Sequence, residues 1–260
     1  MLPHDILYIR STDGGATFGP VMTLGNNEGF SSNPAIAAYE NSVYVVWSES
    51  SSASSQSEIL FRKSVDSGVT FGDIINLSNN EGDSIQPTMS VNRKNIFVAW
   101  ADRTPTEDNL LKIFYRKSTN GGLNFGGITD LSGNLRPSFE PKLAASQRSV
   151  HIVWSSGETT PGEIFYRKSD NNGITFGKVD NLSNNVGNSE EPAIAVSRNN
   201  VYIVWMDDSG SDFAESKILY RTSANGGTAF SPVLTNLSPD EPNAGGFFSS
   251  SPDIAVSSFR

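Results

Sequence analysis

The segment Ile164–Phe176 reads Ile-Phe-Tyr-Arg-Lys-Ser-Asp-Asn-Asn-Gly-Ile-Thr-Phe, and closely similar segments occur five times along the 260-residue chain. The serine at the centre of this segment stands at Ser11, Ser64, Ser118, Ser169 and Ser223, so successive copies are 51 to 54 residues apart. Spacing as regular as this indicates a repeated supersecondary unit, each copy of which is stabilised by packing against its neighbours.

Each repeat contains short apolar segments that favour β-strands. Pro192–Val196 begins with a proline, which suits the start of a strand and forbids a helix interior. Val201–Trp205 is rich in β-branched and aromatic residues, Ile218–Arg221 follows it, and we expect a weaker strand around Ser231–Leu237. Four strands in about 50 residues, with no helical period, are typical of the blades of a β-propeller.

The turn after the third strand, which we call the clasp, has the most specific sequence. Asp or Asn at its third position can accept hydrogen bonds from backbone amides ahead of it, and Gly at its fifth position supplies a positive φ. We expect the final Phe to pack beneath the turn. These three roles fall on Asp13, Gly15 and Phe18, on Asp66, Gly68 and Phe71, on Asn120, Gly122 and Phe125, on Asn171, Gly173 and Phe176, and on Asn225, Gly227 and Phe230.

The pattern Ser-x-Asp-x-Gly-x-Thr-Phe resembles the Asp-box of the sialidase-like (BNR-repeat) propellers, and it occurs once in every repeat. The resemblance implies that the clasps are structural and lie on the face opposite the active site. It also implies an extracellular or cell-surface location. The first residues, Met1–Asp5, do not form a signal peptide, so we expect either a cytoplasmic protein or a leader outside this chain. An acidic calcium loop is the alternative for the clasps, but one acid or none at the key position disfavours it.

The repeats predict a single all-β propeller domain over residues 1–260. We expect four complete blades at about 34–78, 87–132, 141–183 and 192–238, and a fifth that combines 5–25 with 252–260. The second strand, which ends at Trp47, Trp100, Trp154 or Trp205 in the complete blades, is missing from the fifth. The open strand edge that results allows pairing with another copy. Alternatively, the chain is one part of a longer array, since sialidases of the family it resembles have six blades.

Composition excludes several classes of function. The formal charge of −9 and the pI near 4.7 disfavour binding to nucleic acid or to anionic lipid. The longest apolar runs are far shorter than the ~20 residues of a membrane helix, so we expect no membrane insertion. The chain has no Cys, which removes disulfides, thiolate metal sites and Cys nucleophiles.

Candidate ligand-binding residues precede the proline that opens each expected first strand. If these prolines start the innermost strands, the five side chains surround the mouth of the central channel and suit sugar hydroxyls or a hydrated cation. The simpler interpretation is that they cap strand starts and face water. The five residues are Asn33, Gln86, Glu140, Glu191 and Ser251.

Acidic residues also gather in the loops between second and third strands, among them Glu49, Asp102 and Asp207, where we expect them to be solvated. A weak Ca²⁺ site at Asp207, Asp208 and Asp212 is conceivable, and no other cofactor is expected. The four Trp suit packing between blades better than sugar stacking, because every complete blade has one. The third-strand arginines are interpreted as blade-edge charges or partners of backbone carbonyls; they are Arg10, Arg62, Arg116, Arg167 and Arg221.

Sialidase activity, by resemblance, would need an Arg cluster, a Tyr–Glu pair, an acidic Asp and an Arg-Ile-Pro motif. The motif is absent, and only Arg103 and Arg136 fall on the presumed binding face. His4 and His151 have no triad spacing. We therefore expect a non-catalytic module for binding or surface display, with a glycan or protein ligand. The alternatives are a glycoside hydrolase that uses Glu140 and Glu191 as paired carboxylates, and a purely architectural repeat that forms oligomers.

Overall fold

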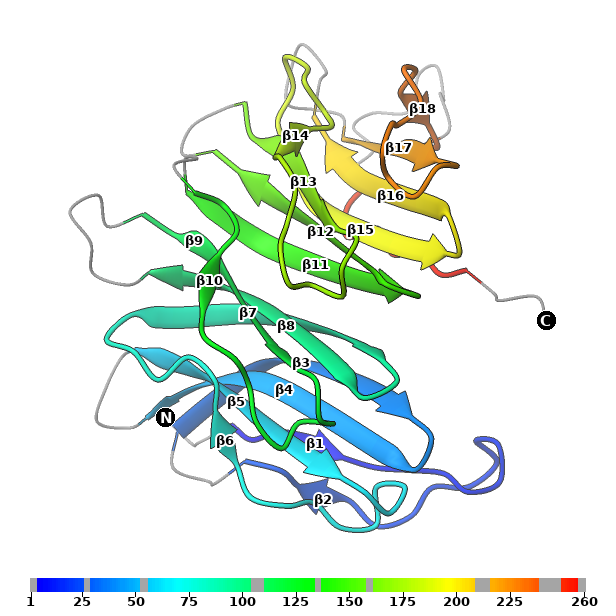
Figure 1. Cartoon of the computed structure of the whole chain (residues 1–260). Helices are drawn as coiled ribbons and strands as arrows, with labels where there is room; N and C mark the ends of the chain where they lie inside the picture. The colour runs from blue at the N-terminus through cyan, green and yellow to red at the C-terminus, as the bar shows by residue number, and fades with distance from the viewer. Residues whose placement is uncertain are drawn as a thin grey trace. The chain divides into compact units, whose positions relative to one another are not determined.

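The computed structural model describes residues 4–25, 29–51, 56–103, 110–133, 137–157, 161–208, 216–238 and 249–256. Every regular element in these ranges is a β-strand (Figure 1). No helix in this part of the chain has the length and apolar character needed to cross a membrane. The chain divides into two compact units, one formed by Met1–Asn109 with Arg116–Ile128 and the other by Leu110–Tyr115 with Thr129–Arg260.

The first unit opens with a two-stranded sheet of β1 (Leu7–Tyr8) and β2 (Met22–Thr23). The next sheet runs in chain order through β3 (Gly29–Tyr39), β4 (Ser42–Ser51), β5 (Ser57–Ser64) and β6 (Ile75–Asn76). The following sheet is formed by β7 (Asp83–Asn92), β8 (Asn95–Arg103), β9 (Lys112–Ser118) and β10 (Thr129–Asp130), and the boundary between the units falls within β9.

The second unit repeats this arrangement twice. One sheet consists of β11 (Ser138–Ser146), β12 (Ser149–Ser156), β13 (Glu163–Ser169) and β14 (Asp180–Asn181). The other consists of β15 (Ser189–Ser197), β16 (Asn200–Asp207), β17 (Lys217–Ser223) and β18 (Thr235–Asn236). Each is an antiparallel meander whose fourth strand has only two residues. The expected all-β class with four short strands per repeat is confirmed.

The sequence predicted that the prolines open the first strands, and this prediction is wrong. β15 begins at Ser189, before Pro192, and its pairing with β16 shifts register between Glu190 and Ala193. The other three first strands show the same shift around their prolines. The physical reason is a β-bulge, which takes residues out of the hydrogen-bond ladder and so tolerates a proline that has no N–H to donate.

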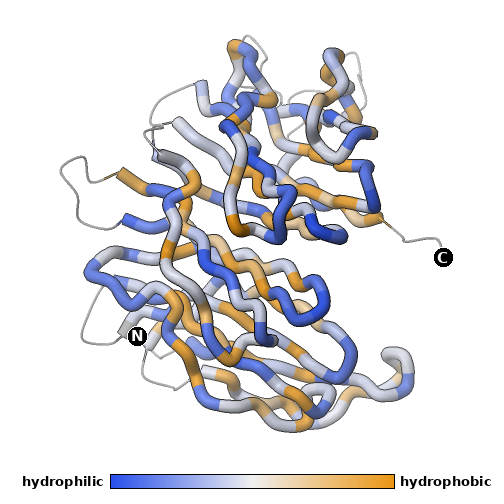
Figure 2. Tube along the Cα trace, viewed as in Figure 1, coloured by the Kyte–Doolittle hydropathy of each residue, from blue (hydrophilic) through white to orange (hydrophobic). Residues whose placement is uncertain are grey.

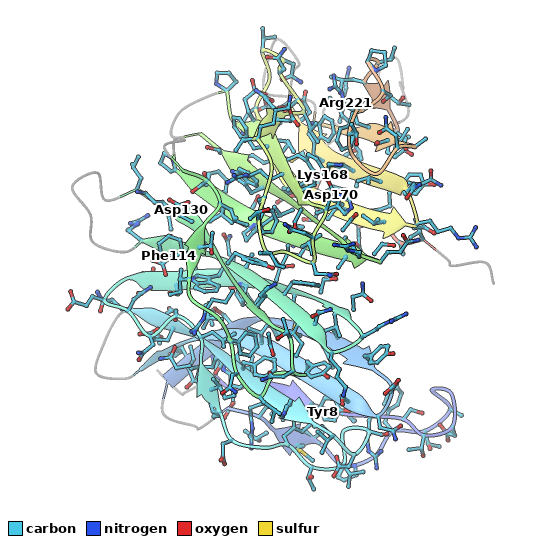
Figure 3. All side chains as sticks on the ribbon, viewed as in Figure 1. Tyr8, Phe114, Asp130, Lys168, Asp170 and Arg221 are labelled. Atoms are coloured by element: carbon cyan, nitrogen blue, oxygen red, sulfur yellow. The ribbon has the colours of Figure 1, made fainter. Side chains whose placement is uncertain are left out.

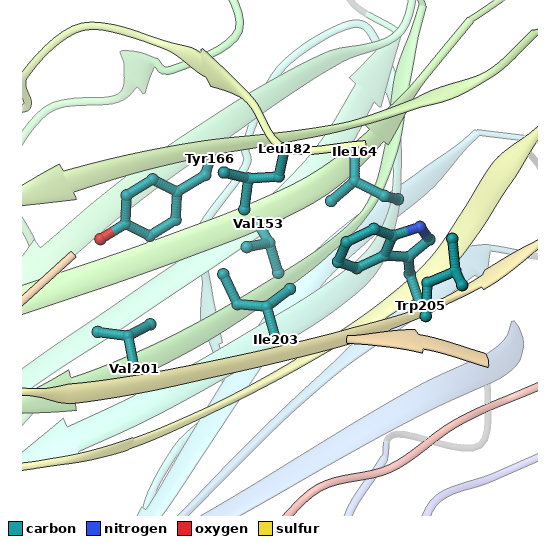
Figure 4. Packing of buried hydrophobic residues seen from close by; sticks show 8 residues of the cluster. Val153, Ile164, Tyr166, Leu182, Val201, Ile203 and Trp205 are labelled. Atoms are coloured by element: carbon teal, nitrogen blue, oxygen red, sulfur yellow. The ribbon is translucent and has the colours of Figure 1, made fainter. Parts of the chain in front are cut away.

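The core lies where the faces of consecutive sheets meet. In the second unit, Ile164, Tyr166 and Leu182 of the β11–β14 repeat pack against Ile203 and Trp205 of the next sheet (Figure 4). Figure 2 shows apolar residues concentrated along the strands. All four Trp side chains are completely buried, so they stabilise the packing of sheets and cannot form a sugar-stacking platform.

Each clasp is held by hydrogen bonds between residues close in sequence. In the β5–β6 clasp, Thr70 donates its backbone N–H to Asp66 Oδ1 at 2.9 Å and its hydroxyl to Oδ2 at 2.6 Å, while Gly68 donates its N–H to Ser64 Oγ at 2.8 Å. The hydrogen bonds that Asp66 accepts from the Ser64 hydroxyl and from Thr70 hold its pKa well below its usual range. Gly68 has a φ of +78°, which only glycine adopts without strain.

The Phe of the clasp does not pack beneath its own turn. Phe71 lies edge-to-face against Tyr8 of the preceding repeat, with ring centroids 5.0 Å apart, and the later clasps repeat this contact. Phe18 belongs to the first repeat and is 61% exposed. The Phe therefore joins one repeat to the one before it, which a prediction from a single turn cannot reveal.

Four of the five third-strand arginines donate hydrogen bonds to carbonyl groups, with one correction for Arg10, whereas Arg221 Nε has no hydrogen-bond partner among the described residues. Arg62 donates Nε to Gly72 O at 2.7 Å and Nη1 to Leu24 O of the preceding repeat at 2.8 Å. Arg116 and Arg167 make the same pair of bonds. Arg10 stands one residue later in its repeat, because Ile9 aligns with Arg62. Its Nη1 reaches Ser67 O of the following repeat instead.

Candidate functional site

The five residues that precede the prolines share an unusual backbone conformation. All have a left-handed φ, between +49° and +54°, although none is glycine. A residue before proline is normally extended, and a left-handed φ costs a non-glycine residue about 1–2 kcal/mol. In β3, β7, β11 and β15 a bulge accompanies this conformation and takes the residue out of the ladder, whereas Ser251 has the same φ outside any described strand. The residues are Asn33 and Gln86 in the first unit and Glu140, Glu191 and Ser251 in the second.

The three residues of the second unit form a connected row. Glu140 Oε2 accepts the backbone N–H of Glu191 at 3.0 Å and the hydroxyl of Ser155 at 3.2 Å. Glu191 Oε2 in turn accepts the N–H of Ser251 at 2.5 Å and its hydroxyl at 3.2 Å. Each carboxylate thus satisfies the backbone N–H of the equivalent residue one repeat later. We call these three residues the carboxylate row.

Glu140 is the more buried of the two carboxylates. Burial raises its pKa, and the charges of Glu191 and Glu190 add to the increase, while the hydrogen bonds from Glu191 and Ser155 oppose it. Two neighbouring carboxyl groups with unequal environments are a common feature of sites that move protons. The same hydrogen bonds, however, give both carboxylates a structural role.

Asn33 and Gln86 occupy the same bulge position in β3 and β7 of the first unit. Asn33 is exposed and accepts a hydrogen bond from the Ser32 hydroxyl at 3.2 Å, whereas Gln86 is partly buried. The structure therefore groups the five predicted residues by conformation and links three of them directly. Their arrangement as one ring stays a prediction.

Three acids expected to be solvated are in fact buried: Glu49, Asp102 and Asp207. Asp102 Oδ2 accepts hydrogen bonds from the Ser84 hydroxyl, the Asn80 side-chain amide and the Trp100 indole N–H, at 2.6 to 3.0 Å. Burial is possible because each of these donors compensates the lost hydration of the carboxylate. The expectation failed because the strand continues past the Trp and carries the acid inside with it.

A signal for these buried acids was present in the sequence. The acid stands two residues after the Trp in three of the four copies, and residues two apart on a strand share a face. Ser156 takes the place of the acid in the β11–β14 repeat, where Trp154 Nε1 has no hydrogen-bond partner among the described residues, but Trp205 Nε1 has none either although Asp207 follows it. The Trp-x-acid spacing therefore predicts a buried acceptor.

The predicted calcium ligands are engaged in other contacts. Asp207 Oδ2 accepts hydrogen bonds from Ser189 and Asn185, at 2.6 and 2.7 Å, and Asp208 Oδ1 accepts the N–H of Asn188 at 2.5 Å. Asp212 lies outside the described residues. Within the described ranges, no group of three or more His, Asp or Glu side chains is arranged to hold a metal ion. Calcium binding stays a prediction.

The remaining residues considered for catalysis do not join the carboxylate row in any contact given by the structure. Arg103 is exposed at the end of β8 in the other unit, and Arg136 lies outside the described residues. His4 is exposed and lies edge-to-face on Phe30. His151 is fully buried in β12, where Nδ1 lies 2.7 Å from the Tyr166 hydroxyl.

The carboxylate row and the clasp lie at opposite ends of a sheet. In the β15–β18 sheet, Ser189 pairs with Asp207 at the end that bears the bulge. Val201 pairs with Ser223, the first residue of the clasp, at the other end. At this clasp end of the β11–β14 repeat, Lys168 and Asp170 form an ion pair at 3.2 Å (Figure 3). Polar residues capable of binding a hydroxylated ligand are thus separated from the structural turns.

Comparison with known proteins gives no match to a family model and none to a curated protein sequence. Solved structures do match. A sialidase of Trypanosoma rangeli is 12% identical over 84% of this chain, with a TM-score of 0.59, and 39% of its own length is covered. The family 117 glycoside hydrolase Zg3597 of Zobellia galactanivorans is 10% identical over 90% of this chain, with a TM-score of 0.53 and 77% of its length covered.

The K499G mutant of the NanB sialidase of Streptococcus pneumoniae is 12% identical over 82% of this chain, with a TM-score of 0.55. This chain covers 52% of that protein and about two fifths of the Trypanosoma sialidase. At these identities the likeness concerns the fold alone. The chain has a sialidase-like propeller fold built from four-stranded sheets.

Proposed function

We propose that this chain is a non-catalytic module that binds a glycan or protein ligand at the bulge end of its sheets. The observation that supports this most directly is the set of five polar, non-glycine residues held in a left-handed conformation before proline. Glycine would relieve the backbone strain at each position. A polar side chain at all five is expected where the side chain itself has a use.

The contacts of the carboxylates favour binding over hydrolysis. Glu140 and Glu191 each use one oxygen to satisfy a backbone N–H of the next repeat, so removing either acceptor leaves that N–H unsatisfied. The sequence also lacks the Arg-Ile-Pro motif of the sialidases it resembles. Hydroxyl-rich ligands suit such a row, because the remaining carboxylate lone pairs can accept their hydrogen bonds.

The proposal includes the architecture predicted from the sequence. The five repeats would be arranged radially, so that all bulge ends share one face, and the module would act at the cell surface or outside the cell. Two of the compared proteins are sialidases and one is a glycoside hydrolase, so a glycan is the first ligand class to test.

A glycan array with matched variants tests this function. Glu191→Lys reverses a charge in the carboxylate row and should weaken binding at least tenfold. Glu40→Lys is the control, because Glu40 is exposed and has a φ of +53° but lies in a hairpin at the clasp end of a sheet. Equal binding by both variants, or no binding to glycans and to candidate protein ligands, contradicts the proposal.

A glycoside hydrolase is the second candidate, and the raised pKa of Glu140 beside Glu191 favours it. A protonated Glu140 would act as the acid on the leaving group, and Glu191 as the nucleophile or base. Turnover of aryl-glycosides that collapses in both Glu140→Gln and Glu191→Gln supports this function. Absence of turnover by the unaltered protein rejects it.

A further inference from the structure

Consecutive repeats are joined by one recurring interface with two different sides. One side, which we call the receiving face, presents an Ile and an aromatic residue of the third strand and the Leu that follows the fourth. The other, the inserting face, presents a third-strand Leu or Phe, the clasp Phe and the apolar residue before the fourth strand. In the first unit, Ile6, Tyr8 and Leu24 receive Leu60, Phe71 and Ile74.

The same interface recurs in the second unit, where Ile164, Tyr166 and Leu182 receive Leu219, Phe230 and Leu234 (Figure 4). Wherever it forms, the Leu of the receiving face is at most 2% exposed, as at Leu24, Leu77, Leu131 and Leu182. The ring of the clasp Phe lies 4.9 to 5.1 Å from the receiving aromatic ring in all four cases.

In the part of the chain that the structure describes, no segment covers the receiving face of the last repeat, β15–β18. Leu237 stands where the four buried leucines stand, yet it is 55% exposed. Ile218 and Tyr220 are only partly buried, whereas their counterparts Ile164 and Tyr166 are at most 1% exposed. Tyr220 stacks on Tyr202 of its own sheet, with ring centroids 6.5 Å apart, and so presents a flat aromatic surface.

The inserting face of the first repeat, β1–β2, is uncovered as well. Leu7, Phe18 and Val21 occupy the positions of Leu60, Phe71 and Ile74, and they are 64%, 61% and 60% exposed. A Cβ atom added at Gly15 of this clasp would meet nothing within 4 Å. At Gly227, which has the same place in the last clasp, it would overlap the hydroxyl of Tyr166. Among the described residues, therefore, nothing packs against the first clasp at Gly15 as Tyr166 does at Gly227.

We propose that the receiving face of the last repeat binds the inserting face of the first repeat of a second copy of this chain. One chain carries both halves of an interface that it already builds between its own repeats, and both halves are exposed apolar surfaces. Because the two halves differ, the contact is head-to-tail and generates chains or rings of molecules. This inference does not depend on the proposed ligand, but it replaces the ring closure predicted from the sequence, in which the same two faces would meet within one chain.

One residue sets the expected strength of this contact. In three of the four internal interfaces, an arginine donates Nη1 to the carbonyl of the receiving Leu at 2.7 to 2.8 Å, as Arg62 does to Leu24. Ile9 stands at that position in the first repeat. The contact between copies lacks this charge-assisted hydrogen bond, so it should be weaker than the internal interfaces and reversible.

Sedimentation velocity over a wide concentration range tests the proposal. The unaltered chain should associate reversibly, and Ile9→Arg should tighten the association about tenfold by restoring the hydrogen bond to Leu237 O. Non-specific hydrophobic association would instead be weakened by the added charge. A chain that is monomeric at every concentration, or association that Ile9→Arg weakens, overturns the proposal.

Charge substitutions on each face test its direction. Phe18→Asp and Leu237→Asp should each abolish self-association, while Ile174→Asp, at a residue 68% exposed on another clasp, should not. A mixture of Phe18→Asp with Leu237→Asp should form one-to-one dimers, because each variant retains the half that the other has lost. Circular dichroism confirms that the variants are folded, which is expected because the altered side chains are exposed. A mixture that stays monomeric contradicts the head-to-tail contact.

Discussion

The two ends of the sheets are held together in different ways. At the clasp end, Asp66 bonds to Thr70, four residues away, and the same short-range bond from the backbone N–H recurs in every repeat. At the bulge end, Glu140 bonds to Glu191, 51 residues away, and Glu191 bonds to Ser251, 60 residues away. The hydrogen bonds of the clasp Asp or Asn therefore stay within one repeat, whereas the carboxylate row ties three consecutive repeats together.

This difference shows where the chain can vary its chemistry. The clasp requires Asp or Asn and Gly at fixed positions, because its hydrogen bonds and its positive φ depend on them. The bulge accepts Asn, Gln, Glu or Ser in the same backbone conformation. A surface whose side chains differ over a constant backbone is suited to recognition, and the following four substitutions examine each end in turn.

The largest effect is expected from Gly227→Ala in the last clasp. Gly227 has a φ of +75°, and a Cβ atom there would overlap the Tyr166 hydroxyl and lie 3.4 Å from His151 Nδ1. Left-handed strain together with overpacking should lower the free energy of unfolding by about 3 kcal/mol or more, measured by urea denaturation.

Gly226→Ala is the matched control, because Gly226 has a φ of +68° but nothing within 4 Å of an added Cβ. It should lose only the strain of the left-handed backbone, about 1–2 kcal/mol. Equal losses in the two variants would show that the clasp does not pack tightly against the preceding repeat.

A slightly smaller effect is expected from acid, through His151. Burial, helped by the charge of Lys168, lowers the pKa of His151 to about 4. The unfolded chain takes up the proton near pH 6.5, so stability should fall as the pH drops from about 6.5 to about 4, by up to about 3 kcal/mol. Stability measured against pH should show this loss in the unaltered chain.

His151→Phe is the informative variant, since Phe97 occupies the equivalent position in the β7–β10 repeat. This variant should lack the loss of stability between pH 6.5 and 4, while any loss from Asp66, whose pKa is depressed, should begin only below about pH 4. A pH profile unchanged by the substitution would assign the acid sensitivity to other groups.

A moderate effect is expected at the bulge end from Glu140→Ala. The substitution leaves the N–H of Glu191 and the hydroxyl of Ser155 without their acceptor, which should cost about 2 kcal/mol in the free energy of unfolding. Glu140→Gln keeps an oxygen acceptor and should cost less than about 1 kcal/mol. Thermal or urea unfolding distinguishes the two, and similar losses would imply that the charge itself is required.

The smallest effect is expected from Asp66→Asn. Asn171 already makes the equivalent backbone bond to Thr175 at 3.0 Å, and its amide donates to the Thr175 hydroxyl at 2.8 Å. In the variant, the side-chain amide at position 66 should donate a hydrogen bond to the Thr70 hydroxyl, whereas Asp66 accepts one from it. The midpoint of thermal unfolding at neutral pH should stay nearly unchanged, and a large drop would show that the clasps are not interchangeable.

Much of the fold could be predicted from the sequence because its signals are local. The spacing of repeats, the β-branched second strands and the Asp-x-Gly turns all depend on residues close together in the chain. The bulge could not be predicted, because a proline is compatible both with the start of a strand and with an irregularity inside one. The left-handed φ of Glu191 was also hidden, since a residue before proline normally avoids it.

The candidate site was predictable only as a list of equivalent residues. Nothing in the sequence indicates that Glu140 would bond to Glu191 of the next repeat, because that bond depends on how two sheets pack. The partner of Phe71 was missed for the same reason, since Tyr8 belongs to the preceding repeat. The burial of Asp102 was the one error that sequence reasoning could have avoided, by noting its spacing from Trp100.

The strained residues before the prolines have a consequence for engineering. The same backbone conformation occurs with four different side chains at Asn33, Gln86, Glu140, Glu191 and Ser251. A combinatorial library limited to these five codons would therefore vary one end of the sheets while leaving the turns and the buried aromatic layers intact. Selection from such a library could retarget the scaffold to new molecules.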